Sequence, residues 1–250
     1  MKIIRSHLRG SKAFNFNCVE RDVWVCEQAS KIPANSIILD VGAGSCPYRE
    51  HFSHCDYKTQ DFASLSPEQL RGRIGYGKID YLCDATNIPV SESSFDAVLC
   101  TEVLEHVPEP IRVIYEFARI IKPGGKLLLT APLGSGIHQE PYHFYGGYTP
   151  FWYQKFLTEA GFSEISVQPN GGFFKHYAQE SIRFVRMTVP WKMKTNFVFL
   201  ILWSPIWFML FLLLAVVFPI CCHWLDRLDH EQHFTIGYHV VATKNSTGDL

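Results

Sequence analysis

A strand that ends in an acid and two glycines is the stretch of this sequence best suited to chemistry. Residues 37–48 begin with an apolar run around Asp40, which predicts a buried parallel strand. Gly42 and Gly44 follow, and they predict a tight turn at which a ligand can approach the backbone. Pro47 suits the first position of a helix, whose N-terminus would add free N–H groups. Because an acid in the strand repels a pyrophosphate and attracts an ammonium group, the pattern indicates a nucleoside with a positively charged tail.

Further strand and turn segments follow this unit along the chain. Most of these segments contain a short predicted strand, and the segment 54–61 ends in the acid Asp61, as in a doubly wound sheet. Together with the glycine turn they resemble the class I S-adenosylmethionine-dependent methyltransferases, over roughly residues 35 to 170 and a last strand near the C-terminus. The segments that carry the resemblance are residues 54–61, 79–85, 95–100, 101–107 and 122–130.

The resemblance implies the fold, the cofactor and the cofactor site. The fold class is α/β, a Rossmann-like sheet of seven mostly parallel strands whose last strand, residues 234–244, is antiparallel between the fifth and sixth. The cofactor is S-adenosyl-L-methionine. A carboxylate at the end of the second strand would bind the ribose, and Asp61 is preferred to Asp56 for this role. The cofactor residues implied are Asp40, Gly42, Gly44, Asp61, Asp84 at the adenine position and Glu102 beside the cofactor.

Two stretches predict helices that pack on this sheet. Residues 18–31 place Val23, Cys26 and Ala29 on one face, and residues 109–121 repeat apolar side chains at helical spacing.

The long connection after the fifth strand predicts the acceptor site. Residues 131–148 follow the carboxyl end of a strand and contain histidines and aromatic residues. His138 or His143 is the candidate general base, and His106 is a weaker one because its spacing from Glu102 suggests a local hydrogen bond. The alternative is that the aromatic residues close the core and the histidines are structural. Methyl transfer depends mainly on alignment, so a base is needed only by an acceptor that loses a proton.

The acceptor class follows from what the chain lacks. The segment after the fourth strand reads Thr101-Glu102-Val103-Leu104, whereas enzymes that methylate amino groups of nucleobases or glutamine would carry an Asn-Pro-Pro-Tyr type motif there. A formal net charge of -1 argues against a nucleic-acid partner. The eight cysteines are scattered, and the cluster 221–223 has too few ligands for a closed zinc site, so we expect no metal. Small molecules, sugars or lipids are the acceptors indicated.

A long apolar segment interrupts the family plan before the last strand. Residues 195–225 contain no Asp, Glu, Lys or Arg, which is typical of a membrane segment. Both flanking strands must join one sheet, so chain entry and exit lie on one side of the bilayer. Because Pro205 invites a bend, we expect a re-entrant hairpin or an in-plane pair of helices. A buried oligomer interface or an apolar cap is the alternative. Interfacial tryptophans would be Trp203, Trp207 and Trp224, and headgroup-binding basic residues would be Arg183, Arg186, Lys192 and Lys194.

The sequence therefore predicts a membrane-associated methyltransferase whose catalytic domain lies on the cytoplasmic side. The expected domains are residues 1–180 for the methyltransferase, 181–232 for a membrane-associating insertion and 233–250 for the last strand and tail. The acceptor would be a small molecule, a glycolipid or another lipid-like compound. Two alternatives stay open: a non-catalytic cofactor-binding regulator or scaffold at the membrane, and an NAD-dependent enzyme, which Pro47 at the third glycine position disfavours.

Overall fold

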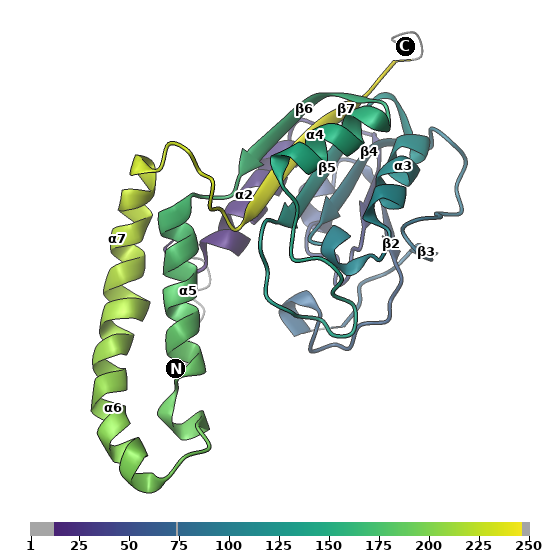
Figure 1. The fold of residues 1–250 in the computed structure, drawn as a ribbon. Helices are drawn as coiled ribbons and strands as arrows, with labels where there is room; N and C mark the ends of the chain where they lie inside the picture. The colour runs from purple at the N-terminus through teal and green to yellow at the C-terminus, as the bar shows by residue number, and fades with distance from the viewer. Residues whose placement is uncertain (1–12, 74, 247–250) are drawn as a thin grey trace. The chain divides into compact units, whose positions relative to one another are not determined.

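The chain folds into two compact units in the computed structural model, which describes residues 13–73 and 75–246 (Figure 1). One unit, called here the helical unit, joins the chain up to Arg21 with Pro169–Ile236. The other, the sheet unit, joins Asp22–Gln168 with the chain from Gly237 on. The division expected from the sequence at residues 180 and 232 stays a prediction, and residues 1–12 of its first domain lie outside the described residues.

The sheet confirms the predicted Rossmann-like fold. Its strand order is β3-β2-β1-β4-β5-β7-β6. β1 pairs with β2 and β4 in parallel, and β7 pairs with β5 in antiparallel orientation, between β5 and β6 as expected. The strands are β1 Ile37–Val41, β2 Asp56–Asp61, β3 Tyr81–Leu82, β4 Phe95–Thr101, β5 Ile121–Pro132, β6 Phe162–Pro169 and β7 Gly237–Lys244.

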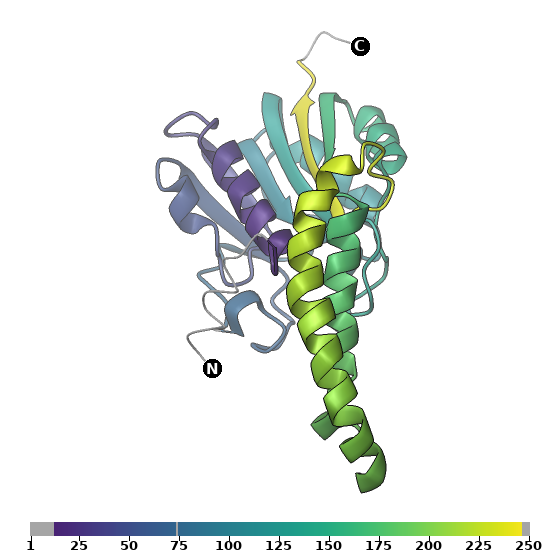
Figure 2. The same ribbon diagram turned by 90° about the vertical axis from the view of Figure 1, so that its left-hand side faces the viewer.

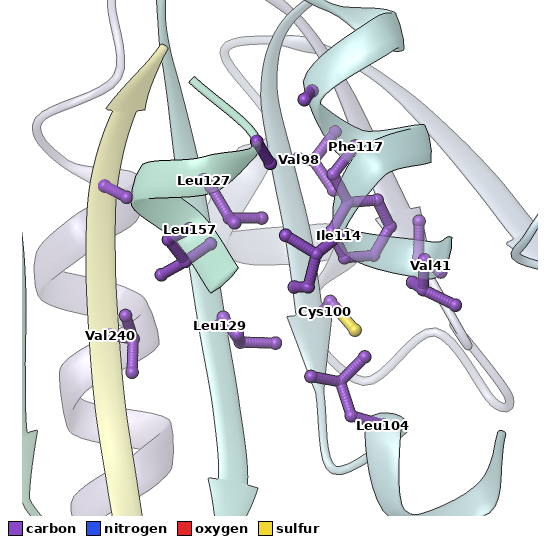
Figure 3. Packing of buried hydrophobic residues seen from close by; sticks show 14 of the residues in the cluster. Val41, Val98, Cys100, Leu104, Ile114, Phe117, Leu127, Leu129, Leu157 and Val240 are labelled. Atoms are coloured by element: carbon purple, nitrogen blue, oxygen red, sulfur yellow. The ribbon is translucent and has the colours of Figure 1, made fainter. Parts of the chain in front are cut away.

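Both faces of the sheet are buried because its central strands are apolar on both sides. Leu39 of β1 and Val98 of β4 are register partners and belong to one cluster, under α3 (Pro110–Ile120) and α4 (Pro150–Glu159) (Figure 3). The alternate residues Ile38 and Ala97 are partners in the cluster on the other face. Side chains of a strand alternate between faces, so a continuous apolar run fills two layers. Polar side chains are thereby left to the strand ends.

Local sequence signals set the ends of the covering helices. The Thr149 hydroxyl accepts a hydrogen bond from the Trp152 backbone N–H, and Pro150 takes the first helical position of α4. Pro110 begins α3 in the same way. Short 3-10 turns fill the connections: η1 Arg49–Phe52, η2 Arg71–Arg73, η3 Leu104–His106, η4 Pro190–Lys192 and η6 Asp226–Leu228.

Two local expectations are wrong. No α-helix follows the glycine turn: Cys46 has a positive φ of 55°, and the chain forms only the four-residue η1, which buries Phe52 before β2 begins. The helix predicted at residues 18–31 is α2 (Phe16–Ala29), but Val23 is 38% exposed whereas Trp24 and its neighbour Val25 are buried. The indole of Trp24 stacks on the His239 ring of β7 with centroids 4.9 Å apart, and this large contact sets the buried face.

The helical unit is built on a two-helix hairpin. α5 (Phe173–Met187) lies beside a continuous helix made of α6 (Phe197–Leu212), the π-turn η5 (Leu213–Val217) and α7 (Phe218–Leu225) (Figure 2). The continuous helix reaches Leu228, spans 32 residues and is apolar enough to cross a membrane by length and composition, which is weak evidence that it does so.

Pro205 lies inside α6, and the helix continues through it, so the apolar segment is one helix rather than the expected pair. The indole N–H groups of Trp203 and Trp207 donate to the Thr188 and Val185 carbonyls of the α5 end at 2.9 and 3.0 Å. These two contacts flank Pro205 and hold the helix on α5, and they offset the one hydrogen bond that proline removes. The hairpin therefore pairs α5 with the whole apolar helix.

The packing of α3 predicts that alanine substitutions at two nearby aromatic residues lower the free energy of unfolding by very different amounts. Phe117 is fully buried, so Phe117→Ala should lower the free energy of unfolding by about 3–5 kcal/mol through lost contact and a cavity. Tyr115 on the same helix is 48% exposed, so Tyr115→Ala is the control and should change it by about 0.5 kcal/mol or less. Urea unfolding measures both; equal losses would contradict the packing described.

Candidate active site

The buried carboxylate of Asp61 fixes the turn that follows β1. Asp61 ends β2 and is 4% exposed. Its Oδ2 accepts a hydrogen bond from the Gly44 backbone N–H at 2.9 Å, and its Oδ1 accepts one from Ala63 at 2.8 Å. Burial raises the pKa of Asp61, and the backbone N–H groups oppose that rise. The structure therefore brings two of the expected cofactor residues, Gly44 and Asp61, into direct contact.

Asp40 lies deeper than the sequence indicated. It is 1% exposed in β1, and its carboxylate accepts a hydrogen bond from the Tyr57 hydroxyl of β2. Burial raises the pKa of Asp40 to about 7, against the lowering effect of the Tyr57 bond. A group this buried is reached by a ligand's ammonium group more readily through water than by direct contact.

Gly42 connects the β1 turn with the segment after β4. Its φ of 68° is in the left-handed region, and its N–H donates to the Gln60 carbonyl at 2.9 Å. A Cβ on Gly42 would overlap the Val103 side chain, so the position has no room for a larger residue. Since Val103 directly follows Glu102, this contact places the two expected parts of the cofactor site side by side.

The remaining two cofactor candidates, Asp84 and Glu102, accept hydrogen bonds from threonine residues. Asp84 is exposed after β3, and its Oδ1 accepts hydrogen bonds from the Thr86 N–H at 2.8 Å and the Thr86 hydroxyl at 2.7 Å. Glu102 has a positive φ of 54° directly after β4, and its Oε1 accepts from the Thr130 hydroxyl of β5 at 2.9 Å. Glu102 therefore lies where the parallel strands β4 and β5 both end.

Three histidines meet at this edge of the sheet. His106 comes from η3 after β4, whereas His138 and His143 come from the loop after β5. The ring centroids of His138 are 4.7 Å from those of both His106 and His143, and the His106 and His143 centroids are 5.8 Å apart. The structure therefore joins both predicted bases and the weaker candidate in one cluster.

Backbone carbonyls determine which ring nitrogens carry protons. Nδ1 of His106 faces the Tyr142 carbonyl, and Nδ1 of His138 lies 2.9 Å from the Gly136 carbonyl. A carbonyl only accepts, so both Nδ1 atoms donate and both Nε2 atoms keep a lone pair. Burial, chiefly, lowers the pKa of His106 to about 4, and burial followed by the charge of His138 lowers the pKa of His143. The cluster is suited to accepting a proton.

The same edge has the geometry of a cation site, which the sequence did not indicate. One ligand atom each from Glu105, His106 and His138 lies within 4.8 Å of the others. Nitrogen lone pairs with Nδ1–H groups fixed on carbonyls are the arrangement that divalent transition metals prefer. The residues come from two separate connections, so no spacing pattern shows them, and the expectation of no metal stays a prediction.

Hydrogen bonds hold the histidine loop against η3. The backbone N–H groups of Phe144 and Tyr145 donate to the Glu105 carbonyl at 2.9 and 3.2 Å. The Tyr148 hydroxyl donates to the Leu104 carbonyl at 2.7 Å. The ring of Tyr142 packs edge-on against Phe62, which follows β2. Part of the aromatic set thus closes the core, as the alternative interpretation expected, while the histidines stay grouped beside it.

Comparisons with known proteins match this architecture. Residues 39–129 match a family model described as "Methyltransferase domain". A Ubiquinone biosynthesis O-methyltransferase from Xanthomonas oryzae pv. oryzae is 36% identical over 104 residues, which are 39% of this chain and 43% of that protein. The chain thus spans less than half the length of the curated relatives it matches.

Solved structures with a similar fold are distant in sequence. A candidate sarcosine dimethylglycine methyltransferase from Galdieria sulphuraria has a TM-score of 0.54 at 16% identity, over 91% of this chain and 86% of that chain. Phosphoethanolamine N-methyltransferase 2 from Haemonchus contortus, solved with S-adenosyl-L-methionine, has a TM-score of 0.52 at 16% identity, over 91% and 53%. At this identity the likeness concerns the fold.

Two groups of the site with large pKa displacements, His106 and Asp40, predict opposite effects of pH on stability. The folded-state pKa of His106 is lowered from 6.5 to about 4, so its contribution to stability is present above pH 6.5 and lost as pH falls toward 4. The folded-state pKa of Asp40 is raised from 3.8 to about 7, so its contribution is present below pH 3.8 and lost as pH rises through 7.

Variants should separate the two effects between pH 4 and 6.5. Relative to wild type, Asp40→Asn should make the free energy of unfolding rise more steeply with pH, by up to about 1.4 kcal/mol per pH unit. His106→Gln should change the slope by a similar amount in the opposite direction. Urea unfolding at a series of pH values measures both slopes, and changes of the same sign in the two variants would contradict the assignment.

Proposed function

We propose that this chain, whose residues 39–129 form a class I S-adenosylmethionine-dependent methyltransferase domain, transfers a methyl group from S-adenosylmethionine to a lipid-like acceptor at a membrane surface. The observation that carries the proposal is the meeting of two groups at one edge of the sheet. The acidic glycine turn of β1 and β2 touches the segment after β4 through Gly42 and Val103, and that segment continues into His106 and its histidine partners.

The β1–β2 edge supplies the groups that would bind the cofactor. Asp61 would accept hydrogen bonds from the ribose hydroxyls with the lone pairs that Gly44 and Ala63 leave open. Gly42 and Gly44 allow close approach of the backbone, and Asp40 would hold the ammonium group through water. Asp84 is assigned to the adenine, and Glu102 lies beside the cofactor. The bound cofactor supplies an electrophilic methyl group on a sulfonium.

The histidines suit an acceptor that loses a proton, such as a hydroxyl compound. His138 is exposed, its Nδ1 donates to a carbonyl, and its Nε2 lone pair is available, so we assign it as the general base. His143 is the second candidate: the Ser135 hydroxyl lies 3.0 Å from its Nε2 and orients its ring. The acceptor proton moves to the base while its oxygen forms the new bond to carbon, and the carbon–sulfur bond electrons return to sulfur.

A lipid-like acceptor is supported by the helical unit. The helix Phe197–Leu228 keeps most of its apolar surface exposed, including Phe197, Leu202 and Met209, and a bilayer would bury this surface. The curated relative from Xanthomonas oryzae pv. oryzae is named for ubiquinone biosynthesis and O-methylation, which agrees with a hydrophobic hydroxyl acceptor. Small soluble molecules and glycolipids are the other acceptors within the proposal, with the catalytic domain on the cytoplasmic side.

The alternative is a non-catalytic S-adenosylmethionine-binding regulator or scaffold at the membrane. It shares the cofactor edge of the sheet but needs no base. The grouping of three histidines, two of which have Nδ1 donating to a backbone carbonyl and so keep a lone pair on Nε2, favours catalysis over this alternative, because a scaffold does not need proton acceptors at this edge of the sheet.

Calorimetric titration with S-adenosylhomocysteine tests the cofactor site. We expect Asp61→Asn to weaken binding by about 10- to 100-fold, because a charged acceptor of the ribose hydroxyls is lost. Asp56→Asn is the matched control, since Asp56 is the other acid of β2 and pairs with Lys58 on the surface at 3.0 Å. Equal effects, or a loss confined to Asp56→Asn, would overturn the assignment of Asp61.

Transfer of labelled methyl groups to extracted membrane lipids tests the base. His138→Gln should lower kcat by about 10²- to 10⁴-fold and leave the affinity for S-adenosylhomocysteine unchanged. His51→Gln is the control, because His51 is an exposed histidine of η1 in the same unit. A loss seen only in His143→Gln would reassign the base. Activity removed by EDTA and restored by a divalent cation would assign the cluster as metal ligands, and transfer only to soluble metabolites would contradict the lipid acceptor.

A further inference from the structure

A hollow of about 420 Å³ lies within the helical unit, on the flank of α5. One wall comes from the stretch that leads into α2, and the other from the second half of α5. Its lining combines two arginines, amides and apolar side chains: Phe14, Asn17, Gln179, Ile182, Arg183 and Arg186. None of these residues belongs to the sheet unit, so the hollow is separate from the candidate active site.

The two arginines make the hollow positive. Arg183 and Arg186 are three residues apart on α5, so their side chains are neighbours on the helix surface and repel each other. Arg183 Nε donates to Glu180 at 3.0 Å, and this ion pair uses only one of the guanidinium nitrogens. Among residues 13–73 and 75–246, no acid forms an ion pair with Arg186. An anion between the guanidinium groups would remove the repulsion and accept several hydrogen bonds.

The amide of Asn17 adds a donor to the same wall. Its Oδ1 accepts a hydrogen bond from the Asn170 side chain at 2.8 Å, so its NH₂ group is the part left for a ligand. Phe14 and Ile182 add apolar side chains to the lining, and a free inorganic anion would gain nothing from contact with them. The lining therefore matches a ligand with an anionic group next to hydrocarbon.

The position of the hollow on the hairpin indicates where such a ligand comes from. α5 packs against the apolar helix through Ala178, Ser181 and Val185, and the hollow occupies the adjacent flank of α5. Packed helices are about 8–10 Å apart, so the arginines lie roughly one helix diameter from the stretch 197–225, which contains no Asp, Glu, Lys or Arg. If that surface enters the acyl region, the arginines reach headgroup depth.

We infer that this hollow binds the phosphate-bearing headgroup of an anionic membrane lipid. The inference rests on the proposed membrane association and deepens it: the apolar helix provides partitioning, and Arg183 with Arg186 provides a preference for negatively charged lipid. The possible ligands share a phosphate ester. The adjacent apolar helix and the apolar side chains of the lining favour a lipid over a soluble phosphate compound.

Flotation of the full chain with vesicles tests this site. Wild type should bind vesicles of phosphatidylcholine with phosphatidylglycerol more tightly than vesicles of phosphatidylcholine alone. Arg183→Gln/Arg186→Gln should reduce binding to the anionic vesicles by more than the roughly 25-fold that general surface attraction supplies for two basic residues, at about fivefold each, and leave binding to neutral vesicles unchanged. Arg183→Lys/Arg186→Lys keeps the charge and should recover only part of the loss, because the planar fork is missing.

The matched control is Lys192→Gln/Lys194→Gln, which removes the same charge from the same unit outside the hollow. An equal loss in this control would show general attraction to a charged surface and overturn the pocket. A wild type without preference for anionic vesicles would do the same. Inorganic phosphate should reduce the preference more than sodium chloride of equal ionic strength does. Phosphate that binds wild type in calorimetry without reducing the preference for anionic vesicles would assign the hollow to a soluble phosphate compound and overturn the headgroup assignment.

Calorimetry with S-adenosylhomocysteine on the same variants separates this inference from the proposed function. Unchanged cofactor affinity with a lost lipid preference supports the pocket independently of the active site. Intact cofactor binding in a wild type that shows no lipid preference overturns the inference alone, whereas absent cofactor binding in a protein with an arginine-dependent preference overturns the proposed activity and supports the lipid site.

Discussion

The two hydrogen bonds from backbone N–H groups to the Asp61 carboxylate are the constraint on which the site depends. One comes from Gly44 in the turn after β1, and the other comes from Ala63, just after β2. A single side chain therefore holds the β1 turn against the end of β2. Gly42 in the same turn lies against the Val103 side chain, so the turn also contacts the segment after β4. Without a carboxylate at this position, the turn after β1 would lose the hydrogen bond that holds it to the end of β2. Its contact with the segment after β4 would lose that support as well.

Burial shifts the pKa values of two groups of the site toward their neutral forms. Asp40 and His106 have pKa values displaced in opposite directions, one upward and one downward, and in both cases burial is the main cause. His138, the proposed base, is exposed instead, and the hydrogen bond from its Nδ1 to the Gly136 carbonyl leaves the Nε2 lone pair to accept a proton.

Most of the strands could be predicted from short apolar runs, glycine turns and acids in a fixed order, whereas the strand order in the sheet came from the family resemblance that this pattern carries. The helix after Gly44 could not: the left-handed Cys46 and the short span to β2 depend on how Phe52 and Tyr57 pack. The buried face of α2 depends on Trp24 meeting β7, a strand more than two hundred residues away. His138 and His143 were found from their loop, but their grouping with His106 and Glu105 required the fold. The unbroken helix at Pro205 likewise depends on two indole contacts that periodicity does not encode.

The insertion of the hairpin before β7 has a consequence for the order in which the protein is made. β7 lies between β5 and β6, so both of these strands have an unpaired edge until the last strand is available. The ribosome synthesises the entire apolar helix before it reaches β7, and the hairpin can meet a bilayer while the sheet is still open. The sheet is therefore completed only after the apolar helix has been synthesised. A nascent chain whose hairpin fails to find its surroundings would expose an apolar helix and two open strand edges at once, which makes the unfinished protein a ready substrate for chaperones and proteases.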